Sequence, residues 1–132
     1  MKIRSPLKIG LLLLAFLAAG YLLFVGFLIF GPTVKSYLQQ TSFESTQWKN
    51  HLDDQDRIKQ KMLRDLLSQH KLIGMTVENI NQLLGSPPKT SYFRDYDYVY
   101  WLGPENGLGV DSEWLCIKFR DGVVAKADVL TD

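Results

Sequence analysis

The chain has one cysteine, and it lacks the short motifs that mark common catalytic sites. Because Cys116 has no second thiol to pair with, a domain in an oxidising compartment would be held together by apolar burial alone. The patterns HExxH, CxxC and GxSxG are absent, and the two histidines, His51 and His70, lie far apart in a charged segment. Catalysis needs several polar groups that converge on one point. We therefore expect no catalytic residue, no cofactor and no small-molecule substrate.

The chain also lacks an excess of either charge. It has 15 basic and 14 acidic residues, without a basic block of the kind that releases counterions from nucleic acid. A nucleic-acid partner is therefore not expected. Four acidic residues could gather around calcium, but they do not have the spacing of an EF-hand loop, so no metal site is predicted. They are Asp95, Asp97, Asp111 and Glu113.

One long segment, residues 9–30, has no charged residue at all. At ~1.5 Å of rise per residue, a helix of this length can cross a bilayer core of ~30 Å. Ser5 can cap such a helix and Pro6 suits its first turn, whereas Gly31-Pro32 is typical of a helix end. The sequence thus predicts a transmembrane anchor in residues 1–32, with the lipid bilayer around it.

Basic residues flank this segment unevenly. Lys2, Arg4 and Lys8 precede it, and only Lys35 follows closely. Positive charge near a membrane span stays on the cytoplasmic side. We therefore predict a single-pass protein with its N-terminus in the cytoplasm and residues 33–132 outside it.

A cleaved signal peptide is the alternative to an anchor. Ala18-Ala19-Gly20 resembles a cleavage site of small residues after a basic start. Cleavage there would leave residues 21–30, which are strongly apolar, as the new N-terminus. Retention of the segment is therefore the favoured interpretation.

The anchor also contains a strip of small residues. Ala15, Ala19 and Gly26 fall within ~40° of one another at the rotation of an α-helix. Small side chains let a second membrane helix approach closely. The strip predicts a helix–helix contact in the membrane.

The next part of the chain predicts a linker and two helices. Residues 33–47 are polar and only thinly apolar, which is typical of a spacer. In residues 48–70, apolar side chains recur at steps of three and four, which indicates one amphipathic helix. Residues 74–85 predict a second, shorter helix that Thr76 can cap and that a glycine and two prolines end. One domain, residues 48–132, is expected to contain both helices.

After these prolines the apolar period changes to two, which indicates strands. Residues 91–94 and 96–102 are rich in tyrosine, phenylalanine, valine and tryptophan, and residues 103–112 form a glycine-containing loop. A final hairpin follows. A three-residue loop with Gly122 in the left-handed conformation places only apolar pairs on one face: Phe119 with Val123, Ile117 with Ala125, and Leu115 with Ala127. Cys116 then lies on the opposite face and is at most partly buried.

Several segments of this order of elements resemble the BamE (small protein A) family. Leu72-Ile73-Gly74-Met75-Thr76 begins one helix and Leu83-Leu84-Gly85-Ser86-Pro87 ends it. Tyr98-Val99-Tyr100-Trp101 lies in the first strands, and residues 116–123 make the last hairpin. The resemblance covers roughly residues 60–130. It implies an α+β fold in which two helices pack on one face of a three- to four-stranded antiparallel sheet.

The same resemblance implies a role. Members of that family are small bacterial envelope modules that bind and stabilise larger membrane-protein machinery without catalysing a reaction. This chain departs from the family because it has a membrane helix in place of a lipidated cysteine, and because residues 33–60 are additional. The expected protein is an accessory or scaffold subunit of a complex in the bacterial inner membrane. An inhibitor or immunity-type module that binds an extracytoplasmic enzyme is the alternative.

Large aromatic side chains alternate along the predicted strands. If helices cover only one face of the sheet, one set of them is exposed, and tyrosine and tryptophan are common anchors of protein interfaces. The alternative is that the sheet curls enough for a loop to cover the second set. We predict a partner-binding surface, with the Trp101 and Trp114 side favoured. Its residues are Trp101, Trp114, Tyr98, Tyr100 and Leu108.

Overall fold

The computed structural model describes residues 6–51, 57–106 and 109–132. It divides into two compact units, Met1–Lys35 and Ser36–Asp132. The first holds a long apolar helix, and the second combines helices with a three-stranded antiparallel sheet. The expected α+β class is therefore confirmed. Ser5 and Leu108, which the sequence singles out, lie outside the described residues.

The N-terminal helix, α1, spans Pro6–Leu38 and begins at the expected proline. Within it, Lys8–Gly31 has a mean hydropathy of 2.6 and is the one helix among the described residues that is long and apolar enough to cross a membrane. This is consistent with a single-pass membrane protein. The helix does not end at Gly31-Pro32, contrary to the expectation. A proline removes only one hydrogen bond from the ladder, and the flanking bonds carry the helix to Leu38.

The predicted linker, residues 33–47, contains the end of α1, an extended segment and the start of helix α2, Ser45–Asn50. The extended segment is attached to helix α3, Ile58–Gln69. The Thr41 amide donates to the Lys61 carbonyl over 3.1 Å, and the Phe43 amide donates to the Asp65 carboxylate over 2.5 Å. This part of the chain therefore packs on the domain that follows.

The single amphipathic helix expected over residues 48–70 is wrong, because α2 and α3 divide that segment. Arg57, the residue before α3, has a positive φ of 57°, which no helix contains. His51, the residue after α2, also leaves the helical conformation, with φ of −101° and ψ of 78°. The apolar period survives the break because both helices turn their apolar residues, Trp48, Met62 and Leu66, into the core.

Helix α4, Val77–Leu84, agrees with its prediction. The Thr76 hydroxyl accepts a hydrogen bond from the Asn79 amide over 3.1 Å, which satisfies one of the free donors at the helix start. At the other end, Gly85 has a positive φ of 73°, and its amide donates to the Asn81 carbonyl over 2.9 Å. Ile80 and Leu84 face the core.

The sheet has the strand order β1-β2-β3, with β1 at Tyr98–Pro104, β2 at Ser112–Arg120 and β3 at Val123–Thr131. Both neighbouring pairs are antiparallel. The strand expected over residues 91–94 does not form; that segment is irregular. Its aromatic residues pack against a face of the sheet and do not extend the sheet.

The register predicted for the last hairpin is wrong. Asp121 and Gly122, with φ of 53° and 79°, form a two-residue turn that sets Arg120 opposite Val123. The sequence favoured a longer loop because this turn alone would set Ile117 against Lys126. A bulge between Lys118 and Phe119 shifts the register instead, so that Ile117 pairs with Ala127. One extra residue thus restores the apolar face.

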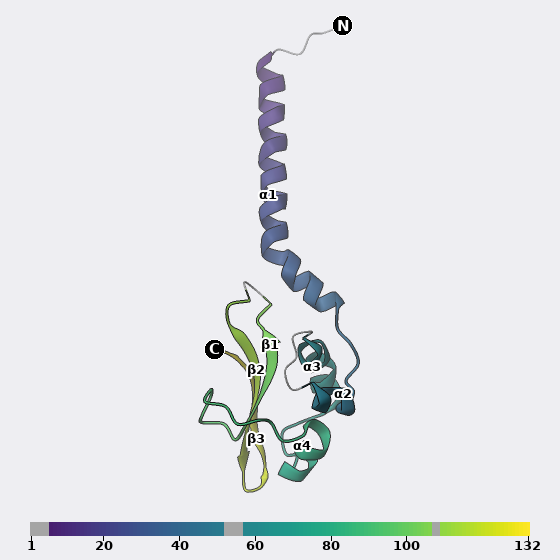
Figure 1. The fold of residues 1–132 in the computed structure, drawn as a ribbon. Coiled ribbons are helices and arrows are strands. Elements are labelled where there is room, and N and C mark those ends of the chain that lie inside the picture. The colour runs from purple at the N-terminus through teal and green to yellow at the C-terminus, as the bar shows by residue number, and fades with distance from the viewer. Residues whose placement is uncertain (1–5, 52–56, 107–108) are drawn as a thin grey trace. The chain divides into compact units, whose positions relative to one another are not determined.

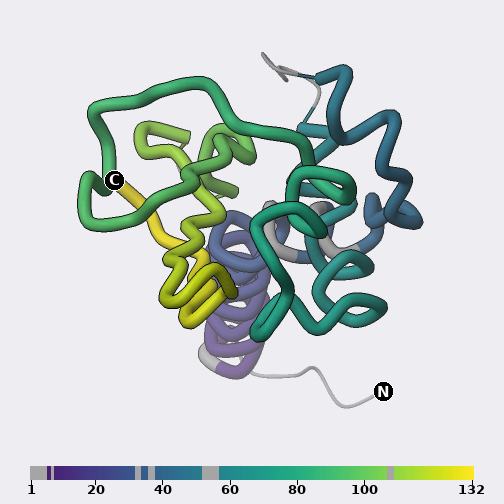
Figure 2. The backbone as a smooth tube through the Cα atoms, turned by 90° about the horizontal axis from the view of Figure 1, so that it is seen from below, coloured from purple at the N-terminus to yellow at the C-terminus, as the bar shows by residue number. Residues whose placement is uncertain are grey.

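Two layers of side chains flank the sheet. Figure 1 shows α2, α3 and α4 together on one side of it, and Figure 2 shows the segment that follows α4 passing along the other side. The main core lies under the helices, where Leu66, Ile80 and Ile117 are fully buried. A second, smaller cluster on the opposite face contains Val99, Trp114 and Cys116.

Candidate functional site

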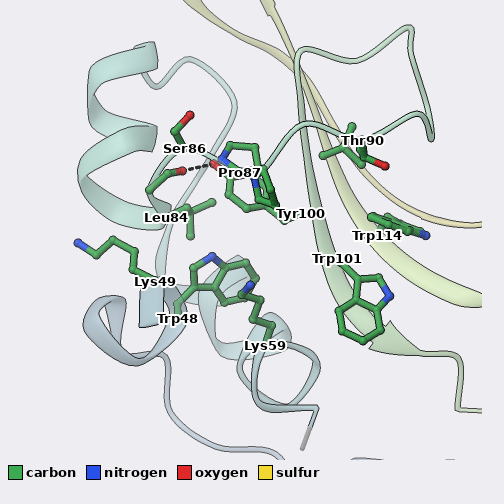
Figure 3. A pocket seen from close by; sticks show the side chains of 13 residues that line it. Trp48, Lys49, Lys59, Leu84, Ser86, Pro87, Thr90, Tyr100, Trp101 and Trp114 are labelled. Atoms are coloured by element: carbon green, nitrogen blue, oxygen red, sulfur yellow. Dashed lines mark hydrogen bonds between the residues drawn. The ribbon is translucent and has the colours of Figure 1, made fainter. Parts of the chain in front are cut away.

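A groove with a volume of about 470 Å³ lies at the boundary between these two clusters. Its lining is mostly apolar and comes from α2, α3, the end of α4 and the segment after it, and strands β1 and β2. Figure 3 shows Trp48 and Lys59 on one side of the space, Trp101 and Trp114 on the other, and Pro87 with Tyr100 between them. Segments that are distant in sequence therefore build one concave surface.

The helix side of the groove is centred on Trp48, which is fully buried. Its helix is fixed in place by the Glu44 carboxylate, which accepts hydrogen bonds from the Thr46 and Gln47 amides over 3.1 and 2.6 Å. These two bonds hold the pKa of the Glu44 carboxyl below its usual value. The Ser45 hydroxyl also donates to the Leu83 carbonyl over 2.7 Å, which ties α2 to α4.

Around Trp48, aromatic and cationic groups pack closely. Its ring lies edge-on to Tyr100 with centroids 6.2 Å apart, and the Lys59 Nζ lies 5.9 Å from the ring centroid. Lys59 is only 4% exposed, so the contact with the ring face helps to stabilise a buried cation. The Trp48 Nε1 has no hydrogen-bond partner among the described residues, and an unpaired buried donor costs about 1–3 kcal/mol.

The segment after α4 is held rigidly at the groove. The Tyr100 hydroxyl donates to the Gly85 carbonyl over 2.6 Å, and burial raises the pKa of this phenol, so that it stays a donor. A Cβ on Gly85 would lie 3.1 Å from the Lys49 Cγ, on a backbone with positive φ that already favours glycine. Pro87 and Pro88 then line the groove with fixed backbones.

On the opposite side of the groove, Trp101 is partly exposed whereas Trp114 is 9% exposed. Tyr92 stacks on Trp114 with ring centroids 5.0 Å apart, and Phe93 meets the same ring edge-on at 6.3 Å. Both come from the segment of residues 86–97. Of the two alternatives for the second face, the structure shows the one in which a loop covers it.

The remaining predicted contact residues lie in different surroundings. Tyr100 is 3% exposed in the main core. Tyr98 is half-buried on the same face, and its hydroxyl donates to the Asn81 side chain over 2.9 Å. Leu108 lies outside the described residues. Of the predicted contact residues, Trp101, Trp114 and Tyr100 line the groove. Ala15, Ala19 and Gly26 lie on the apolar helix α1. The proposed roles of these residues remain predictions.

Cys116 is fully buried, contrary to the prediction of partial exposure. The loop that covers the second face encloses it together with Val99 and Trp114. Burial, reinforced by the nearby Asp128 carboxylate, raises the pKa of the thiol to about 11. Since the thiolate is the reactive form, Cys116 is a packing residue in the native domain.

A polar cluster fastens the covering loop to strand β3. The Tyr96 hydroxyl donates to the Asp128 carboxylate over 2.5 Å, and the Lys126 ammonium donates to the Tyr96 oxygen over 3.0 Å. Lys126 and Asp128 also form an ion pair at 2.8 Å. The bonds from Lys126 and Tyr96 lower the pKa of the Asp128 carboxyl. The segment of residues 86–97 is thus held to strand β3 near its C-terminal end, at Tyr96.

The acidic residues considered for calcium do not come together into a metal-binding group among the described residues. The Asp97 carboxylate accepts the Phe119 amide over 2.7 Å, and the Glu113 carboxylate accepts the Gln60 side-chain amide over 2.6 Å. Each of these carboxylates has a structural hydrogen bond of its own. No family model, curated protein or solved structure matches the chain.

Sequence reasoning missed most of the groove. The sequence pattern places Trp48 and Lys59 in an amphipathic helix over residues 48–70. It assigns Pro87-Pro88 only to the end of the shorter helix over residues 74–85. An apolar helix pattern does not reveal which tryptophan lies at the rim of a core. The signal that was available is the unusual proximity in sequence of two prolines and a cluster of large aromatics.

Proposed function

We propose that this chain is a non-enzymatic accessory or scaffold subunit, anchored in the membrane by α1, whose folded domain binds and stabilises a larger envelope membrane-protein complex. The groove beside β1 carries this proposal. Three tryptophans and two prolines line it, and tryptophan is enriched at the energetic centres of protein interfaces. Trp101 keeps part of its surface open to solvent there.

The anchor supports the second half of the proposal. A span of apolar residues confines the protein to a membrane, which raises the effective concentration of the domain near membrane-bound partners. The basic residues Lys2, Arg4 and Lys8 favour a cytoplasmic N-terminus, and thus a domain on the far side of a bacterial inner membrane. In this proposal the strip of Ala15, Ala19 and Gly26 contacts a membrane helix of the same complex.

Photo-crosslinking of the full chain in its native membranes tests this function. A photoreactive amino acid in place of Thr90, an exposed residue at the groove, should capture a membrane protein of one complex. The same group in place of Lys118, exposed on β2, is the control and should not capture it. Trp101→Ala should abolish the crosslink, and Leu67→Ala, at an exposed apolar residue on α3, should preserve it.

Two outcomes would contradict the proposal. Equal capture from Thr90 and Lys118 would mean that the groove is not the contact surface. Capture of a secreted enzyme whose activity falls on binding would instead make the chain an inhibitor.

A further inference from the structure

The groove runs along a free edge of the sheet. Strand β1 is an outer strand in the order β1-β2-β3, and three successive residues of it, Val99, Tyr100 and Trp101, line the groove. Neighbouring residues in a strand point to opposite faces of a sheet. A groove lined by all three therefore follows the strand edge and reaches both faces.

The backbone at this edge is available for pairing. In the described residues, the backbone groups of residues 98–102 make hydrogen bonds only within the β1–β2 pair. The opposite edge differs, because the Val124 amide donates to the Met75 carbonyl over 2.8 Å and the Gly74 amide donates to the Val124 carbonyl over 2.9 Å. An unpaired strand edge is a template for another extended chain.

The end of β1 sets a limit to this edge. The Gln60 side chain donates to the Pro104 carbonyl over 3.2 Å, and the Arg57 side chain lies 3.5 Å from where a Cβ of Gly103 would be. Both contacts come from the start of α3. Leu102 is also 0% exposed, so the accessible part of the edge ends at Trp101. An edge this short suits a peptide and not a second sheet.

The groove also has a preferred charge. Among the described residues, its lining includes the exposed lysine Lys49 and no acidic residue. Lys49 is exposed at the rim, where its ammonium donates to the Gln82 carbonyl over 3.0 Å. An ammonium has further donors to offer to a carboxylate. Complementarity therefore favours an occupant with apolar side chains and a negative charge at one end.

We propose that the groove binds an extended segment of the partner protein as a fourth strand on β1. The peptide backbone pairs with residues 98–101, alternate apolar side chains enter the space between Trp48 and Trp101, and a carboxylate of the peptide meets Lys49. This mode combines main-chain hydrogen bonds for affinity with side-chain pockets for specificity. The proposal rests on the function proposed above and names the chemistry of its partner.

Selection from a random peptide library tests it with the full chain in detergent micelles. The library consists of short peptides with free carboxyl termini, and Trp101→Ala protein removes background binders. Enriched peptides should alternate apolar and polar residues and carry a carboxylate at one end. Their binding should slow amide hydrogen exchange at residues 98–101. Peptides enriched equally on both proteins, or no slowing at β1, would overturn the proposal.

Matched variants separate the parts of the site. Lys49→Glu should weaken binding of a selected peptide by roughly twofold to tenfold, as for a solvent-exposed charge pair at the rim of an interface, whereas Lys71→Glu, an exposed lysine elsewhere, should not. Unfolding curves of both variants check that each still folds. N-methylation of alternate peptide amides should abolish binding, because it removes the donors that pair with β1. Binding that survives every such methylation, or displacement of the peptide by dodecanoate with no change in exchange at β1, would contradict strand addition.

The two proposals fail separately. A Thr90 crosslink to a membrane protein, with no peptide selected on the groove, would leave the function standing and refute strand addition. The reverse result, peptide binding without any membrane partner at Thr90, would support the site and contradict the function.

Discussion

The two faces of the sheet are covered in different ways. On one face, three helices place regularly spaced apolar side chains over Leu115 and Ile117. On the other face, the irregular segment of residues 86–97 covers Trp114 and Cys116 through a few aromatic contacts and one polar cluster. Regular cover distributes stability over many residues, whereas irregular cover depends on a few of them. The groove lies where the two kinds of cover meet.

The largest expected effect is on the helix-covered face. Ile117→Ala removes a fully buried side chain from the main core and should lower the free energy of unfolding by about 2–5 kcal/mol. Denaturant unfolding of the full chain in detergent, followed by tryptophan fluorescence, measures the change. Ala125→Gly, at an exposed position of β3, is the control for the strand hairpin. A loss below about 1 kcal/mol would mean that the helices are not the main cover.

A smaller and more local effect is expected on the loop-covered face. Tyr92→Ala removes the ring stacked on Trp114 and should lower stability by about 1 kcal/mol. Because Cys116 lies beneath that cover, its alkylation by iodoacetamide should accelerate in the variant. A thiol with a pKa of about 11 in place of 9.0 has about 100-fold less thiolate at neutral pH, so the wild-type protein should react slowly. Equal alkylation rates in the two proteins would show that the segment does not protect the thiol.

The smallest effect concerns the polar cluster on the same face. Asp128→Asn should lower stability at neutral pH by less than about 1 kcal/mol, because the ion pair is partly solvent-exposed. The folded-state pKa of Asp128 is lowered, so its contribution is present above the usual carboxyl pKa and is lost as pH falls through the folded value. Melting curves of both proteins should therefore converge in acid. Asp95→Asn, at an exposed residue of the same loop, is the control.

The helices that cover one face of the sheet were largely predictable from sequence. The irregular segment of residues 86–97 that covers the other face was not. Thr76 and the apolar residues of α4 define that helix through local chemistry, and alternation assigns Leu115 and Ile117 to one face. The break between α2 and α3 is marked by the positive φ of Arg57, which a helical period of apolar residues does not show. The bulge in the hairpin was not predictable either. Alternation along two strands assumes that each residue pairs with one partner, and a bulge adds an unpaired residue that shifts the register.

The burial of Cys116 was missed for a related reason. Alternation places it correctly on the face opposite Ile117, but exposure depends on whether another segment lies over that face. The period of two and the composition of residues 91–94 predict a strand, and a loop that covers the second face was only the alternative. Whether an aromatic-rich stretch joins the sheet as a strand or packs across its face depends on long-range tertiary contacts, which local sequence patterns do not show.

The pairing of residues 74–76 with the start of β3 has a consequence for the order of folding. The β2–β3 hairpin is closed by local contacts, and such hairpins form in about 1–10 μs. The bonds between Gly74 and Val124 join distant parts of the chain and need the hairpin tip to exist first. We therefore expect the start of α4 to acquire hydrogen-exchange protection after the hairpin in a pulse-labelling experiment. If the hydrogen bonds between residues 74–75 and Val124 form late, the helices pack on the sheet only after the hairpin has formed.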